Sequence, residues 1–561
     1  MAQKKVIDLR ILETSDVHGS FFPYNFVSRK PVKGSLASVA TYVKELRKQY
    51  GKNVLVLENG DILQGQPTNY YYNFVHPEKE NIAAQVVNFI GYDAQTVGNH
   101  DVETGHEVYD KWIKELDCPT VGANIVDTRT GKPYVKPYVI VERDGVKIAI
   151  LGMLTPAIPN WLNESLWSGL RFEEMVSCAK YWVDYIQKHE GAHIIAGLFH
   201  SGRDGGITTD KYMEDASLKV AEEVDGFDVV FYGHDHFSHN EVIKNRHTGR
   251  EVVCIDPSCN AHLLSDVSIR VTLQDGKLID KQVKGELIDM DKVPADEAYM
   301  NHFEGVIDEM KSYVSRKIGE FTVPMHSRDC FFGASAFTDF IHDVQLQLTN
   351  ADISFNAPLM FNTTIEAGPI YVSDMFKLYK YENKVYVLEL TGEEVRRHLE
   401  LSYDLWVNTM KSKDDHIMKL DNNFMGDMQR YGFKNLTFNF DSAAGIDYEV
   451  DVTKPDGQKV RILRMSDGTP FDEKKVYRVA MNSYRGNGGG ELLTRGAGIP
   501  LDEIKNRIVF QSERDQRHYL MLEIEKQKVM TPKAHTNWKF VPEEWTVDAV
   551  KRDKELIFGK K

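Results

Sequence analysis

Five short polar clusters occur in the first half of the chain, each at the end of an apolar run typical of a strand. The clusters are Asp16-Val17-His18, Gly60-Asp61, Gly98-Asn99-His100-Asp101, His200 in Leu198-Phe199-His200-Ser201-Gly202, and Gly233-His234-Asp235-His236. Loops at strand ends are where functional side chains gather in α/β folds. Because the clusters supply Asp, Asn and His, they offer the ligands that two neighbouring transition-metal ions require.

Strand-like apolar runs alternate with amphipathic helical stretches in this half. The strand-like runs are residues 53–57, 94–97, 146–153, 193–199, 228–232 and 251–255. The helical stretches include residues 35–50, 81–90 and 105–116. Such alternation predicts an α/β layered domain in which helices pack outside the sheets.

The length of 561 residues exceeds what one core normally supports and favours two domains. We expect a first domain over residues 1–290, a connecting helix over 291–320, where apolar residues recur at helical spacing, and a second domain over 321–550. In the second domain a strand over residues 384–390 should end where Thr391 caps a helix and Glu394 closes a capping box. The charged residues 551–561 are expected to form a solvated tail.

The overall composition excludes several classes of protein. A net charge of −15 argues against binding nucleic acid polymers, which requires a basic surface. The chain has no run of eighteen apolar residues, so no membrane span is expected. The polar start without a signal core indicates a cytoplasmic protein, or a periplasmic or secreted one whose signal has been removed. The five scattered cysteines predict buried thiols rather than a disulfide framework.

The ligand types indicate which metals would bind. An Asp-X-His segment offers a carboxylate oxygen and an imidazole nitrogen to one ion, and a set without cysteine favours Mn, Zn or Fe. Asp61, at a strand end, is able to place its two oxygens on two ions. Two ions about 4 Å apart hold a hydroxide between them and clamp the oxygens of a phosphate during in-line displacement.

The five clusters in this order resemble the signature of the calcineurin-like metallophosphoesterases, and the second domain narrows the resemblance to the two-domain 5′-nucleotidase and 2′,3′-cyclic-nucleotide phosphodiesterase family. The resemblance covers nearly the whole chain. It implies a four-layer-type α/β domain of sandwiched β-sheets flanked by helices, followed by a mixed α/β substrate-binding domain. It also implies that one ion is held by Asp16, His18, Asp61 and His236, and the other by Asp61, Asn99, His200 and His234.

The same resemblance gives His100 the catalytic role, in which it stabilises the transition state or protonates the leaving oxygen. In the family an acidic residue three positions later orients this histidine. Here that position is Glu103, where Asp is usual, and Asp101 is a nearby competitor for the orienting role.

The second domain matches the family's substrate pocket at five positions. Arg328 corresponds to a phosphate-contacting arginine, Asn356 to a base-contacting asparagine, Tyr381 and Tyr484 to two aromatics that sandwich the base, and Asn487 to a polar residue before paired glycines. Ring stacking suits this purpose because every base has a π-face. The two tyrosines have core packing as their alternative role.

Two family residues are missing. Phe361 stands where a second arginine is expected, and Gly490 stands where an aspartate would bind the ribose hydroxyls. Their loss should weaken selection for an ordinary nucleoside 5′-monophosphate. Arg485 is a candidate to replace some of the positive charge.

The sequence thus predicts a phosphoester hydrolase that uses two divalent ions and acts by in-line attack of a metal-bridging hydroxide on a small phosphoester, either a nucleoside 5′-monophosphate or a 2′,3′-cyclic nucleotide. One alternative is the same chemistry on a non-nucleotide phosphoester or a nucleotide-sugar pyrophosphate. The other is a nucleotide-binding or sensor protein without catalysis.

Overall fold

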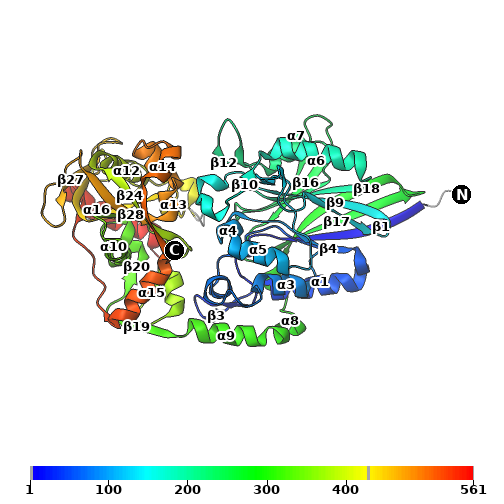
Figure 1. Cartoon of the computed structure of the whole chain (residues 1–561), viewed down its shortest axis with the longest axis horizontal. Helices are drawn as coiled ribbons and strands as arrows, with labels where there is room; N and C mark the ends of the chain where they lie inside the picture. The colour runs from blue at the N-terminus through cyan, green and yellow to red at the C-terminus, as the bar shows by residue number, and fades with distance from the viewer. Residues whose placement is uncertain (1–3, 426–429, 560–561) are drawn as a thin grey trace. The chain divides into compact units, whose positions relative to one another are not determined.

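The computed structural model describes residues 4–425 and 430–559, and the chain divides into two compact units, residues 1–314 and 315–561 (Figure 1). Each unit has its own sheets and its own buried core. Within the described residues, no helix combines the length and the apolar character that crossing a membrane would require.

The first sheet of the N-terminal unit has the strand order β18-β17-β1-β4-β5. These strands are β1 (Lys4–Thr14), β4 (Val54–Glu58), β5 (Ala94–Gln95), β17 (Leu263–Gln274) and β18 (Lys277–Asp289). Strands β1, β4 and β5 are parallel, so their carboxyl ends lie at one edge of the sheet.

The second sheet has the order β15-β16-β14-β11-β9-β8. Its strands are β8 (Tyr138–Arg143), β9 (Val146–Leu154), β11 (Ile194–His200), β14 (Val229–Tyr232), β15 (Ser238–Lys244) and β16 (Glu251–Pro257). Strands β9, β11, β14 and β16 run parallel.

The two sheets share one core between them, because alternate residues of each strand point to opposite faces. In β4, Leu55 and Leu57 belong to this shared core, whereas Val54 and Val56 pack under the helices on the other face. In the second sheet, Ile148 of β9 faces the shared core and Ala149 faces the outer helices. This arrangement confirms the predicted sandwich of sheets flanked by helices.

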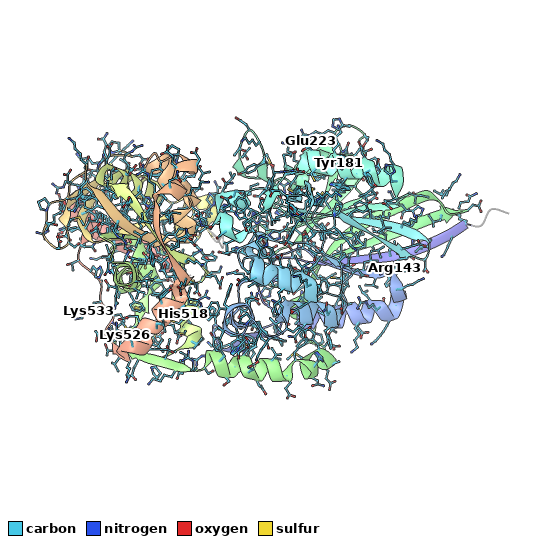
Figure 2. The ribbon with its side chains drawn as sticks, viewed as in Figure 1. Arg143, Tyr181, Glu223, His518, Lys526 and Lys533 are labelled. Carbon is cyan, nitrogen blue, oxygen red and sulfur yellow. The ribbon has the colours of Figure 1, made fainter. Side chains whose placement is uncertain are left out.

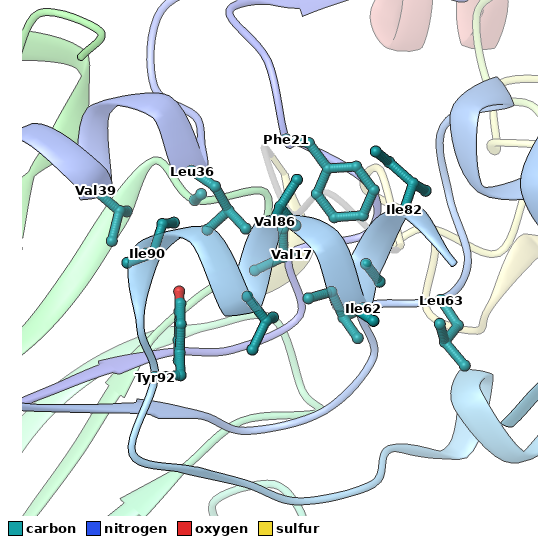
Figure 3. Close-up of a cluster of buried hydrophobic side chains, with 14 of the residues drawn as sticks. Val17, Phe21, Leu36, Val39, Ile62, Leu63, Ile82, Val86, Ile90 and Tyr92 are labelled. Carbon is teal, nitrogen blue, oxygen red and sulfur yellow. The ribbon is translucent and has the colours of Figure 1, made fainter. Parts of the chain in front are cut away.

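The outer helices begin and end close to the predicted positions. The first sheet is covered by α1 (Leu36–Tyr50), α3 (Ile82–Ile90) and α5 (His106–Glu115). Asn81 caps α3 by accepting the Ala83 N–H at 2.9 Å, and Gly91 ends the helix with a left-handed backbone. Ile82, Val86 and Ile90 lie along one face of α3 and belong to the core between the first sheet and its outer helices (Figure 3).

The second sheet is covered by α6 (Met175–His189) and α7 (Ser217–Glu223). Cys178 and Ala179 of α6 are buried against the sheet, while Tyr181 on the outer face is 62% exposed (Figure 2). All five cysteines are buried thiols outside any disulfide, which agrees with the prediction of buried thiols.

Helices α8 (Glu297–His302) and α9 (Glu304–Val314) occupy most of the expected connecting segment. Tyr299, Phe303 and Met310 are buried in the core of the N-terminal unit, so both helices are part of that unit.

The C-terminal unit contains a sheet of order β25-β21-β28-β24-β29. Its strands are β21 (Ile353–Asn356), β24 (Lys384–Thr391), β25 (Ser442–Ala444), β28 (Val476–Asn482) and β29 (Ile508–Asp515). Helix α12 (Gly392–Trp406) begins as predicted, because Thr391 Oγ1 accepts the Glu394 N–H and Glu394 Oε2 accepts the Thr391 N–H.

The described end of the chain differs from the expected solvated tail. Residues as far as Phe558 form α16 (Glu543–Phe558). Asp553 is fully buried, and its carboxylate accepts the Met418 N–H at 2.8 Å and contacts His416 Nδ1 at 2.5 Å. The many charged residues of this segment predicted a solvated tail. The prediction fails at Asp553, because its buried carboxylate is a specific partner for His416 and Met418.

Candidate active site

The loops after β1 and β4 are joined by backbone hydrogen bonds. Asp16 N donates to Gly60 O and His18 N donates to Asp61 O, both at 3.0 Å. These bonds fix two predicted ligand loops side by side at the carboxyl edge of the first sheet.

The first predicted ligand set is brought together. Asp16, His18, Asp61 and His236 each present a ligand atom, and these atoms all lie within 4.8 Å of one another. His18 Nε2 is 3.0 Å from His236 Nε2, which is 3.3 Å from Asp16 Oδ1.

The second predicted set is brought together beside it. Ligand atoms of Asp61, His200 and His234 lie within 4.8 Å of one another. Asn99 Oδ1 lies 3.0 Å from His200 Nε2 and 2.8 Å from His234 Nδ1. Asp61 is common to both sets, as a bridging ligand must be.

Hydrogen bonds outside the sets fix which imidazole nitrogen faces inward. His18 Nδ1 lies 3.1 Å from Gln64 O and His200 Nδ1 lies 2.7 Å from Asn59 O. A carbonyl only accepts, so each Nδ1 carries a proton and Nε2 is the nitrogen left to face the site. Ligating histidines in proteins are oriented in this way.

The donor set fits divalent cations. Asp16 Oδ1 is buried with no hydrogen-bond partner among the described residues. Asn99 Oδ1 lies 3.0 Å from the inward nitrogen of His200. Burial lowers the pKa of His200, but Asp61 and Asp16 outweigh burial and raise that pKa to about 9, so the site draws positive charge to this place. A divalent cation bound between these oxygen and nitrogen atoms would supply the same positive charge.

The backbone at the predicted ligands is strained. Asp16, His18, Asp61, His234 and His236 all have positive φ, between 47° and 81°. Such conformations cost non-glycine residues about 1–3 kcal/mol each and concentrate at functional sites. The surrounding packing holds these side chains in position against that cost.

Two glycines allow the ligand loops to approach closely. A Cβ atom at Gly98 would overlap the Asp61 carboxylate, and one at Gly233 would overlap Ser15 Oγ and Asp16 Oδ2. Both positions therefore require glycine because another loop occupies the space of a side chain.

The site keeps its carboxylates ionised. Burial raises the pKa of Asp16, but His200 and His236 outweigh burial and bring the pKa below its usual range. The pKa of Asp61 is likewise lowered, by His200 and His100 against burial. Burial and His236 lower the pKa of His18 to about 3, which favours its neutral, ligating form.

His100 lies beside the first set, with its ring centroid 5.6 Å from that of His18. Its Nδ1 is 2.6 Å from Glu103 Oε2, so the acidic residue three positions later contacts it as the family pattern implies. Asp101 instead accepts backbone N–H groups of Asp61, Ile62, Leu63 and Gly98 at 2.8–3.0 Å. Asp101 thus holds the ligand loops together.

Two of the five predicted substrate residues have buried polar atoms without partners in the described part of the chain. Asn356 ends β21 and is 2% exposed, and both polar atoms of its amide lack a hydrogen bond. Arg328 lies in a 3₁₀ turn (Ser327–Phe331), and its Nε is also buried and unpaired. Polar groups left in this way suggest a ligand site.

The other three predicted substrate residues lie on loops or short turns. Tyr381 precedes β24 and has Lys380 Nζ 5.4 Å from its ring centroid. Tyr484 lies in α13 (Ser483–Gly486), with its ring 6.1 Å from that of Phe438, and Asn487 is the C-cap of this helix. All three side chains are partly exposed.

Arg485 does not replace the missing positive charge. Its buried guanidinium donates to Asp441 through Nε at 2.8 Å and Nη2 at 3.0 Å, and to the Phe438 carbonyl at 2.9 Å. Asn439 Oδ1 accepts from Nη1 at 3.2 Å. Because these groups occupy the guanidinium, the suggestion that it serves a substrate phosphate is wrong.

The two departures from the family pattern have a physical basis in the structure. A Cβ atom at Gly490 would overlap Asn439 Oδ1 and Arg485 Nη1, and Gly490 has a φ of 72°. A side chain there would have to displace both groups and would strain the backbone. Phe361 stacks on Tyr431 with ring centroids 4.0 Å apart, so its position serves aromatic packing.

Sequence reasoning missed the residues that orient the ligands. Asn59 and Gln64 act through backbone carbonyls, which no side-chain motif reveals. Glu214 contacts His234 Nε2 at 3.1 Å from a hairpin that carries none of the five clusters. No spacing rule connects it with His234.

Comparison with known proteins agrees with this geometry. The calcineurin-like phosphoesterase model matches residues 9–238, and the 5′-nucleotidase C-terminal domain model matches residues 317–495. The chain is 27% identical to the trifunctional nucleotide phosphoesterase protein YfkN of Bacillus subtilis, over 96% of this chain but only 39% of that protein. It is 26% identical to a 2′,3′-cyclic-nucleotide 2′-phosphodiesterase/3′-nucleotidase of Haemophilus influenzae, over 96% of this chain and 88% of that one.

A solved structure of a putative 5′-nucleotidase from Staphylococcus aureus has the same fold. The TM-score is 0.78 at 20% identity, with 95% of this chain and 99% of that chain covered. The matched family models define a phosphoester hydrolase of the calcineurin-like class. More narrowly, the chain belongs to the calcineurin-like phosphoesterases that carry a 5′-nucleotidase C-terminal domain.

Proposed function

We propose that the protein is a metal-dependent nucleotide phosphoesterase whose main substrates are 2′,3′-cyclic nucleotides. The observation that carries the proposal is the convergence of the seven predicted ligands into two sets that share Asp61. The relatives named above support a nucleotide as the substrate, since both are named as enzymes that hydrolyse nucleotide phosphoesters.

In this proposal Asp16, His18, Asp61 and His236 hold one divalent ion, and Asp61, Asn99, His200 and His234 hold the other. The oxygen and nitrogen donors suit Mn, Zn or Fe. When bound, such ions lower the pKa of water and offset negative charge on phosphoryl oxygens.

His100 is the proposed catalytic residue. With Nδ1–H donating to Glu103, interaction with the departing ester oxygen falls to Nε2. The Glu103 carboxylate orients the ring, so His100 is suited to stabilise negative charge on that oxygen or to transfer a proton to it. The backbone N–H of His100 also donates to Asp61 Oδ1 at 2.8 Å. This bond links the proposed catalytic residue directly to the proposed bridging ligand.

The C-terminal unit is proposed to bind the nucleotide. The unpaired amide of Asn356 suits the polar edge of a base, and Arg328 suits a phosphate. Tyr381 and Tyr484 are proposed to stack on the base, and Asn487 to contact it from the glycine-rich loop of residues 486–490.

The cyclic substrate is favoured by the residue at position 490. An aspartate there would bind the 2′- and 3′-hydroxyls of the ribose, whereas a 2′,3′-cyclic nucleotide has neither of these two hydroxyls and carries a negative phosphate in their place. Glycine removes that repulsion, and an acid in its place would have to displace Asn439 and Arg485. A second candidate is hydrolysis of 5′-monophosphates, which the match to a 5′-nucleotidase C-terminal domain favours.

The test is a substrate panel on metal-reconstituted protein, scored by phosphate release after a monoesterase is added to the diester reactions. The panel contains 2′,3′-cyclic nucleotides, 5′-monophosphates, a nucleotide sugar and an aryl phosphate, with the His100→Ala variant as control. The proposal predicts the highest kcat/KM for a cyclic nucleotide. Hydrolysis of the aryl ester alone would place the substrate outside nucleotides, and no hydrolysis at all would indicate a binding protein.

A further inference from the structure

Glu214 lies behind the candidate ligand His234. It belongs to the hairpin formed by β12 (Gly205–Thr208) and β13 (Met213–Asp215). Its Oε1 is 3.1 Å from His234 Nε2, while His234 Nδ1 points toward Asn99 Oδ1 at 2.8 Å. His234 therefore connects Glu214 with the second ligand set.

The position of Glu214 is held from several sides. Its Oε2 accepts the Ile207 N–H at 2.7 Å, across the hairpin. Its backbone carbonyl accepts the hydroxyls of Thr155 at 2.9 Å and Ser201 at 2.8 Å, and Ser201 directly follows the candidate ligand His200. The backbone of Glu214 is thus tied to the loops that follow β9 and β11, while Ile207 holds its carboxylate.

The partner of His234 differs in charge from those of two other candidate ligands. His18 and His200 donate to the neutral backbone carbonyls of Gln64 and Asn59. His234 faces a carboxylate instead. An anionic partner makes an imidazole a stronger electron donor than a carbonyl partner does.

This difference matches the difference between the two ligand sets. The first set contains the carboxylates of both Asp16 and Asp61, whereas the second shares Asp61 and otherwise has the neutral amide of Asn99. Glu214 adds a negative charge behind the set that has fewer carboxylates.

We infer that Glu214 is the positioning residue of the second ligand set, where it fixes the tautomer of His234 and strengthens binding of one of the two divalent ions. The inference rests on the proposed metal-dependent function. It predicts that loss of the Glu214 charge lowers the affinity for one ion and leaves the affinity for the other ion unchanged.

The test is titration of Mn²⁺ into the metal-stripped full chain, followed by calorimetry and by metal analysis after dialysis at limiting metal. Glu214→Gln keeps an acceptor for Ile207 and nearly the same shape. The matched control is Asp210→Asn, which removes one negative charge from the exposed tip of the same hairpin. An Asn99→Ala variant identifies the ion of the second set.

Wild-type protein should bind two ions, and the Asp210→Asn control should bind both of them with the wild-type affinities. Glu214→Gln should lower the affinity for one ion about 10–100-fold. The affected ion should be the one whose affinity Asn99→Ala also lowers. Unchanged affinity for both ions would overturn the role of Glu214, as would equal weakening of both or the loss of a third ion held by Glu214 itself. Wild-type protein that binds no ion would instead overturn the proposed function.

Discussion

The Nδ1 atom of His100 lies 2.6 Å from Oε2 of Glu103, three residues later along the same turn. The longer side chain of glutamate reaches the imidazole from the C-cap of α4 (Asn99–Val102). The substitution of Glu for the usual Asp thus keeps the contact that the resemblance implies.

Replacing His100 by Ala should reduce kcat by roughly 10²- to 10⁴-fold, the usual contribution of a general acid. Metal content should stay at the wild-type level, because His100 belongs to neither ligand set. Steady-state kinetics and metal analysis on the same preparation check both parts. A variant with the wild-type kcat would remove His100 from the mechanism.

Glu103→Gln should reduce kcat by about tenfold, less than His100→Ala, because Glu103 acts through His100. The double variant His100→Ala/Glu103→Gln should then be no slower than His100→Ala alone. Additive losses in this cycle would show that Glu103 acts independently of His100.

Asp61→Ala should lose both metal ions, since Asp61 belongs to both ligand sets. Asp16→Ala is the matched comparison, because it removes a carboxylate from the first set only and should weaken one ion. Metal analysis after dialysis distinguishes the two variants. Retention of one tightly bound ion in Asp61→Ala would contradict the bridging arrangement.

The sequence predicted the parts of this site that depend on local patterns. Helix α1 starts after Ser35 and helix α3 after Asn81, within one residue of the predictions, because caps and apolar spacing are local signals. Three clusters follow parallel strands of the first sheet and two follow parallel strands of the second, so within each sheet the clusters gather at the carboxyl ends of the strands.

The parts that the sequence did not predict depend on contacts between distant segments. Arg485 pairs with Asp441, 44 positions away, and so becomes a structural residue of the glycine-rich loop. Asp553 is buried within a helix that its charged surroundings gave no reason to expect. Neither contact has a spacing that marks it in the sequence.

Asn356→Ala should raise the KM for nucleotides by roughly 5- to 150-fold, which corresponds to about 1–3 kcal/mol for a lost buried hydrogen bond. The kcat/KM for an aryl phosphate should not change, because that substrate has no base. The exposed Asn423→Ala is the control. An equal loss on both substrates would remove Asn356 from base recognition.

His342 of α10 (Ala336–Thr349) should make the stability of the C-terminal unit depend on pH. It is 1% exposed, and its Nδ1 donates to Ser354 Oγ at 2.8 Å. Burial and the nearby His535 lower its pKa to about 3, against the raising effect of Asp343 and Asp441. The ring is therefore neutral in the folded protein at neutral pH.

The unfolded chain binds this proton with a pKa of about 6.5, so acid favours unfolding. The contribution to stability is complete above about pH 6.5 and falls by about 1.4 kcal/mol per pH unit as the pH decreases toward 3. Urea unfolding measures the free energy of unfolding at pH 7 and at pH 5. Between these two pH values the wild type should lose about 2 kcal/mol more of this free energy than His342→Gln loses. The exposed His247→Gln should retain the wild-type slope, and an equal slope in His342→Gln would show that His342 is not the group responsible.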